Sequence, residues 1–98
     1  MRMTPEMCEG LHQNMREGIT AASGLTSTLY LTIMERVWEG RIDRIGRTWK
    51  FNSFGEYLTA NPMGGLYTKV EDLRKLITHD ARVLEMFDAE IKRGGGAK

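Results

Sequence analysis

The sequence predicts an all-α fold: a compact bundle of about five helices with one irregular arginine-rich loop and a helix-turn-helix-like unit. Apolar residues recur at helical spacing in several stretches of the chain. Helix-start signals precede these stretches, and glycine or proline breaks follow most of them. The composition, 41% hydrophobic and 28% charged, is typical of a globular protein.

The chain length predicts a single domain. Its 98 residues suit one helical domain over residues 1–93, followed by a flexible glycine-rich tail over residues 94–98. Cys8 is the one cysteine, so no disulfide forms within the chain and the expected location is the cytoplasm. No stretch has the ~20 apolar residues that span a bilayer, so we expect no membrane partner.

The first helix is expected to begin at Thr4-Pro5-Glu6. Threonine caps a helix, proline suits the first helical position, and an acid is favourable at the positive end of the helix dipole. An apolar stripe follows at spacings of four: Met7, Leu11, Met15 and Ile19. Ser23-Gly24 is expected to end this helix, and the short break predicts an antiparallel neighbour.

The second helix is expected to start at Leu25 and to continue to Trp38, with Gly40 ending or bending it. Its apolar stripe is wider than that of the first helix. We therefore expect it to lie centrally in the bundle or to contact two partners, one of them another copy of the chain.

The segment after Gly40 is the arginine-rich loop. Asp43 to Gly46 fits a type I turn, with Asp at its first position and Gly at its last. Residues 48–51 alternate polar and apolar, like a short strand. A small hairpin is one interpretation, but because two strands alone are marginally stable we expect an ordered loop with a short extended piece.

The stretch from Ser53 to Ile77 holds the helix-turn-helix-like unit. Capping boxes begin at Ser53 and at Thr68, and Pro62 with Gly64-Gly65 marks a turn between them. An ordinary helical hairpin that supports the core is the alternative interpretation. The last helix is expected to run to about Arg93, with a buried stripe of Val83, Leu84, Phe87 and Ile91.

Several residues in the C-terminal two thirds follow one family pattern. They are Trp38, Asp43, Gly46, Phe51, the segment 53–57, Pro62, Gly65-Leu66 and Leu73. In these residues the chain resembles a family of small proteins from actinobacteria and their phages. It departs from the family pattern at Tyr67, where glycine is expected. The resemblance implies a phage or mobile-element setting with a regulatory role, and it brings no catalytic residues.

Positive charge gathers in ten residues of a chain whose net charge is +1. Residues 41–50 carry four basic residues and one acid. Arginine binds phosphate bidentately, and aromatic rings stack on unpaired bases. The predicted nucleic-acid-binding residues are Arg41, Arg44, Arg47, Lys50, Trp49, Lys69, Arg74 and Lys75. The alternative is a solvated face whose arginines pair with Glu35, Glu39 and Asp43, with the tryptophans in the core.

No residue pattern predicts catalysis, a metal site or a cofactor. Cys8, His12 and His79 lack metal-ligand spacing, and Gly64-Gly65 lacks the lysine of a phosphate-binding loop. The functional hypothesis is a small, non-enzymatic, phage-type regulatory protein of the host cytoplasm that binds nucleic acid. The alternative is a protein-interaction module that binds or inhibits a host protein, or that forms a homodimer.

Overall fold

The computed structural model describes residues 3–21 and 24–94. These residues form five α-helices, one 3-10 helix and one two-stranded sheet. The elements are α1 (Pro5–Ala21), α2 (Leu25–Met34), η1 (Val37–Glu39), β1 (Arg41–Ile42), β2 (Thr48–Trp49), α3 (Phe54–Thr59), α4 (Val70–Leu76) and α5 (Ala81–Gly94). The chain is therefore mostly helical but not purely α. The predicted tail begins at the last residue of α5, and residues 95–98 lie outside the described part.

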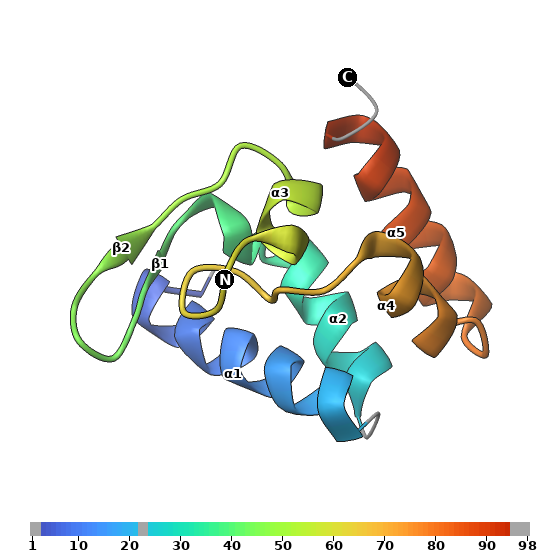
Figure 1. The fold of residues 1–98 in the computed structure, drawn as a ribbon, viewed down its shortest axis with the longest axis horizontal. Helices are drawn as coiled ribbons and strands as arrows, with labels where there is room; N and C mark the ends of the chain where they lie inside the picture. Colours follow the sequence, from blue (N-terminus) through green and yellow to red (C-terminus); the bar gives the residue numbers. More distant parts are fainter. Residues whose placement is uncertain (1–2, 22–23, 95–98) are drawn as a thin grey trace.

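Figure 1 shows α2 in the middle of the molecule, with the β1–β2 hairpin at one end and α4 and α5 at the other. The α2 helix packs against α1 and also against α5, and β1 packs against α1. The central position expected for this helix is confirmed. None of the helices in the described part is long and apolar enough to span a membrane.

The α1 helix begins where the sequence predicts, but its buried face differs. The Thr4 hydroxyl accepts the Met7 N–H at 3.2 Å, as an N-terminal cap does. Met7 itself is exposed, whereas Cys8 and His12 are buried beside Leu11 and Met15. The helix can turn His12 inward because the imidazole finds a buried hydrogen-bond partner there.

The second helix ends earlier than the periodic pattern predicts. The chain leaves the α-helix after Met34, Arg36 adopts a left-handed φ of 51°, and η1 follows. This break turns Val37 and Trp38 into the core, where both are buried. The Trp38 ring packs against Phe54 with centroids 4.9 Å apart.

The third and fourth helices do not form a helix-turn-helix. The Ser53 hydroxyl accepts the Glu56 N–H at 3.1 Å, so the first predicted cap is present. The second is absent: the N-cap is Lys69, which makes no side-chain hydrogen bond, and the Thr68 N–H donates to the carbonyl of Leu58. The connection over residues 60–69 is longer than a helix-turn-helix turn, and it packs back onto α3.

Candidate functional site

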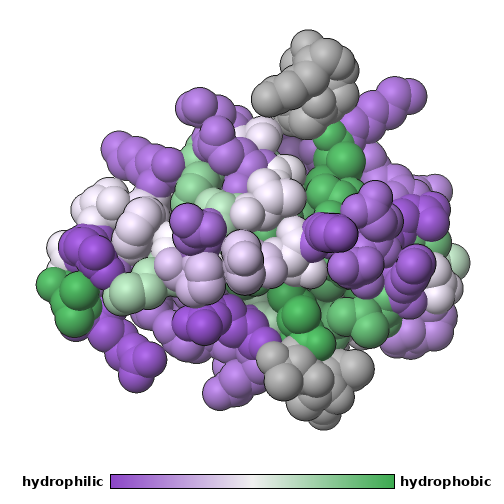
Figure 2. Space-filling view, in the orientation of Figure 1, coloured by the Kyte–Doolittle hydropathy of each residue, from purple (hydrophilic) through white to green (hydrophobic). Residues whose placement is uncertain are grey.

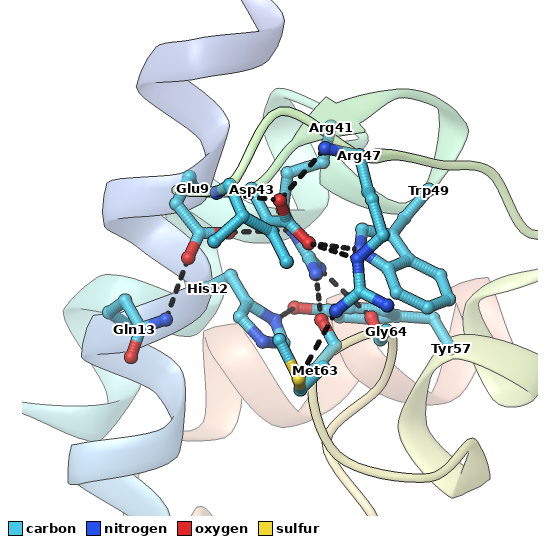
Figure 3. Close-up of polar contacts among 11 residues, drawn as sticks. Glu9, His12, Gln13, Arg41, Asp43, Arg47, Trp49, Tyr57, Met63 and Gly64 are labelled. Atoms are coloured by element: carbon cyan, nitrogen blue, oxygen red, sulfur yellow. Dashed lines mark hydrogen bonds and ion pairs between the residues drawn. The ribbon is translucent and has the colours of Figure 1, made fainter.

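The arginine-rich segment forms a hairpin that is organised by Asp43. One carboxylate oxygen accepts the N–H groups of Ile45 and Arg47, and the other accepts the Trp49 indole N–H at 2.8 Å (Figure 3). Gly46 completes the predicted turn at φ 89°. The Trp49 hydrogen bond, followed by the backbone amides and the Arg47 charge, lowers the pKa of Asp43 to about 2. This carboxylate explains why so short a hairpin is ordered.

Arg41 is an internal cation. Its side chain is 1% exposed. Its Nε forms an ion pair with Glu9 Oε1 at 2.9 Å, although the two atoms do not have the geometry of a hydrogen bond. One terminal nitrogen donates to the Gly64 carbonyl at 2.9 Å and the other to the Met63 carbonyl. Figure 3 shows this guanidinium joining α1 to the α3–α4 connection. Arg41, which the sequence predicts as a nucleic-acid contact, is therefore out of reach of an external phosphate.

A second polar layer lies beneath Arg41 and Glu9. His12 Nδ1 lies 2.8 Å from the Tyr57 hydroxyl, and both side chains are fully buried. Burial, reinforced by the charges of Arg41 and Arg16, lowers the pKa of His12 to about 3. Burial also raises the pKa of Tyr57. Both groups are thus neutral near pH 7 and closed to a substrate, which favours a structural role over a catalytic one.

Burial of neutral His12 makes the stability of the fold depend on pH. The unfolded chain takes up a proton on this histidine near pH 6.5, whereas the folded chain does so only near pH 3. The free energy of unfolding should therefore fall below pH 6.5, by up to about 1.4 kcal/mol per pH unit. Urea titrations at several pH values between 7.5 and 4.5 measure this slope. His12→Asn should flatten this slope, whereas His79→Asn, at an exposed position, should leave it unchanged. A wild-type stability that does not change between pH 7.5 and 4.5 would contradict a buried, neutral His12.

The other basic residues of the hairpin are exposed, but they differ in whether they form an ion pair. Arg47 pairs with Asp43 at 3.3 Å, and its guanidinium lies 5.3 Å from the ring centroid of the half-buried Trp49. Arg44 and Lys50 make no ion pair within the described part of the chain. Two unpaired cations and one paired arginine therefore remain at this end of the molecule.

The basic residues predicted on α4 do not join the hairpin. Arg74 binds both carboxylate oxygens of Asp88 on α5, at 2.9 and 3.0 Å. Lys69 and Lys75 are exposed beside the same helix. Because α4 and the hairpin lie at opposite ends of the molecule (Figure 1), the eight predicted residues do not share one surface.

A pocket that the sequence pattern did not indicate lies between α1 and the hairpin. It measures about 390 Å³ and is lined by Glu9, Gln13, Arg16, Asp43, Arg44, Ile45 and Met63. A signal for it existed in the sequence: Glu9, Gln13 and Arg16 recur at helical spacing, so they lie on one side of α1. Nothing local to the sequence indicated that the hairpin would cover that side.

A second surface lies along α2 and α5. The α2 helix has no charged residue, and its outer side exposes Leu31 (44%) and Met34 (57%). Two pockets line the junction with α5, of about 490 Å³ beside Leu31 and about 310 Å³ beside Met34. We call this surface the α2–α5 face and define it by Ser27, Tyr30, Leu31, Met34, Arg82, Met86 and Ala89.

Comparisons with known proteins find no match for this chain. No family model, no curated protein and no solved structure matches it. The resemblance to actinobacterial and phage proteins therefore stays a prediction. In the described ranges, no three His, Cys, Asp or Glu side chains come together as metal ligands.

Proposed function

We propose that this protein is a small, non-enzymatic protein-interaction module of phage type, acting in the cytoplasm, and that it binds through the α2–α5 face. The observation that carries the proposal is the uncharged α2 helix. One side of it fills the core with Leu25, Leu29 and Ile33, and the opposite side leaves Leu31 and Met34 in solvent. An exposed apolar surface of this kind marks an interaction site.

The partner that we assign to this face is a second copy of the chain. A twofold axis would pack the apolar stripe of α2 against itself, and no like charges in α2 would meet across the axis. An antiparallel arrangement would also place Arg82, beside the N-terminal half of one α2, next to the C-terminal end of the other. Glu35 is the C-cap residue of that end, and Glu90, paired with Arg36 and Arg93, lines the pocket beside Met34.

The dimer is expected to be weak, because the face is smaller than a standard interface of about 20–30 residues a side. Sedimentation equilibrium of the isolated chain should show self-association that strengthens through the micromolar range. Leu31→Lys or Met34→Lys should abolish it with little change in Tm, since both residues are exposed. Thr59→Lys, exposed on α3, is the matched control and should still dimerise. A wild-type chain that stays monomeric at the highest attainable concentration would contradict the dimer.

Nucleic-acid binding is the second candidate function, favoured by the exposed and unpaired Arg44 and Lys50. With Arg47 and the half-buried Trp49 they would contact a backbone phosphate and an unpaired base. Fluorescence anisotropy should then show weak binding to a single strand at low salt. The logarithm of the binding constant should fall with the logarithm of the salt concentration with a slope of roughly −1.5 to −2, as two or three phosphate contacts predict. Arg44→Ala with Lys50→Ala should remove it. Absence of binding to any duplex or single strand at low salt would rule this candidate out.

A further inference from the structure

Met34 on the α2–α5 face is the most exposed methionine in the described part of the chain. It is 57% exposed, compared with 54% for Met7 on α1 and 47% for Met63. Met86, from α5, lines the same pocket of about 310 Å³ as Met34. Figure 2 shows hydrophobic side chains among hydrophilic ones in the half of the molecule where Figure 1 places α2 and α5. A thioether therefore lies in solvent on the surface that we assign to a second copy of the chain.

An exposed methionine sulfur is open to oxidation by hydroperoxides. The sulfur attacks the terminal peroxide oxygen, the O–O bond breaks, and the proton of the attacked oxygen passes to the leaving oxygen. The sulfur loses two electrons, and the products are methionine sulfoxide and water or an alcohol. Met63 is a poorer target, because its sulfur already accepts a hydrogen bond from Arg47 at 3.2 Å. Among the described residues, Met34 and Met7 are therefore the favoured targets.

Oxidation of Met34 would change the chemistry of the α2–α5 face. The outer side of α2 carries no charge, and Leu31 and Met34 are its exposed large apolar side chains. A sulfoxide is polar, so it loses free energy when it leaves water without a hydrogen-bond donor. The two arginines of the pocket beside Met34, Arg36 and Arg93, already pair with Glu90. The sulfoxide would therefore weaken packing of α2 against another copy.

We propose that the α2–α5 face is a redox-sensitive interface: oxidation of Met34 by a hydroperoxide separates the two copies, and enzymatic reduction of the sulfoxide restores the dimer. This inference rests on the proposed dimer. Because that dimer is weak, free monomers expose Met34 to the oxidant, and association covers it. Oxidation and association therefore compete for the same side chain. Cys8 is buried, so it is the less accessible sulfur.

The first test measures the rate at which hydrogen peroxide oxidises each methionine of the full chain, read by peptide mass spectrometry. Below the Kd of the dimer, Met34 and Met7 should oxidise at similar rates, because their exposed fractions are similar. Above the Kd, the Met34 rate should fall in proportion to the fraction of dimer. The Met7 rate should not change, because Met7 lies outside the α2–α5 face. Equal rates for the two methionines at every concentration would overturn the proposal.

The second test measures the dimer Kd by sedimentation equilibrium before and after peroxide treatment. Peroxide should raise the Kd of Met7→Leu about tenfold or more, because this variant keeps the Met34 sulfur. Methionine sulfoxide reductases should reverse that rise. Peroxide should not change the Kd of Met34→Leu, because leucine has no sulfur to oxidise.

The outcomes separate this inference from the proposed dimer. A chain that self-associates equally well with Met34 as the sulfoxide would overturn this inference alone. The same holds for a Met34→Leu variant that loses its self-association on oxidation as Met7→Leu does. An unoxidised chain that stays monomeric would overturn the dimer and this inference together.

Discussion

Replacing Arg41 with methionine is expected to lower the free energy of unfolding by about 3–5 kcal/mol. The substitution leaves the Glu9 carboxylate buried without its counter-charge and removes the donors to the Gly64 and Met63 carbonyls. A domain of this size has a total stability of roughly 5–15 kcal/mol, so the variant should be near the limit of folding. Urea or thermal unfolding followed by circular dichroism measures the loss.

Two further variants show whether the loss of stability comes from the burial of Arg41 or from the loss of a positive charge. Arg44→Met removes the same charge from the exposed hairpin turn and should cost less than about 0.5 kcal/mol. Glu9→Met combined with Arg41→Met removes both buried ions, and this double variant should be more stable than Arg41→Met alone. Equal stability of Arg41→Met and Arg44→Met would mean that Arg41 is not an internal link between α1 and the α3–α4 connection.

Replacing Gly65 with alanine should be comparably damaging, at about 3 kcal/mol or more. A Cβ at this position would lie 2.4 Å from the Ala60 Cβ and 2.5 Å from the Tyr57 carbonyl oxygen. The carbonyl belongs to the backbone of α3, and it also accepts the N–H of Leu66. The connection would have to lift off α3, exposing the buried Leu66.

Gly10→Ala is the control for this substitution. Gly10 lies within α1, and apart from its chain neighbours and the backbone of the helix itself no atom comes within 4 Å of a Cβ built there. Alanine is the better helix former, so this variant should gain up to about 1 kcal/mol. Parallel denaturant titrations of the two variants compare them directly. A Gly65→Ala variant as stable as wild type would show that the connection does not contact α3 as closely as described.

Several features that depend on neighbouring residues could be predicted from the sequence, although the cap expected at Thr68 was wrong. The start of α1 at Pro5, the Ser53 cap and the turn from Asp43 to Gly46 each rest on residues within one turn of chain. The resemblance also placed a glycine position at Tyr67, where the chain has a left-handed φ of 51°. This left-handed conformation is one that glycine adopts without strain.

Features that depend on distant residues could not be predicted. Arg41 is indistinguishable from Arg44 in sequence pattern, yet its burial requires a glutamate on α1 and two carbonyls after α3. The same holds for His12, which is buried only because Tyr57 reaches it. The spacing of arginines every three residues therefore gave no indication of which guanidinium would face solvent.

The central functional claim is that two copies of the chain meet through α2. Cysteine cross-linking tests it most directly, because the native Cys8 is buried and leaves an introduced thiol as the reactive one. Under mild oxidation, Leu31→Cys should form a disulfide-linked dimer at protein concentrations where Thr59→Cys does not. Cross-linking of the two variants at the same rate, or of neither, would contradict the α2–α5 face as the binding surface.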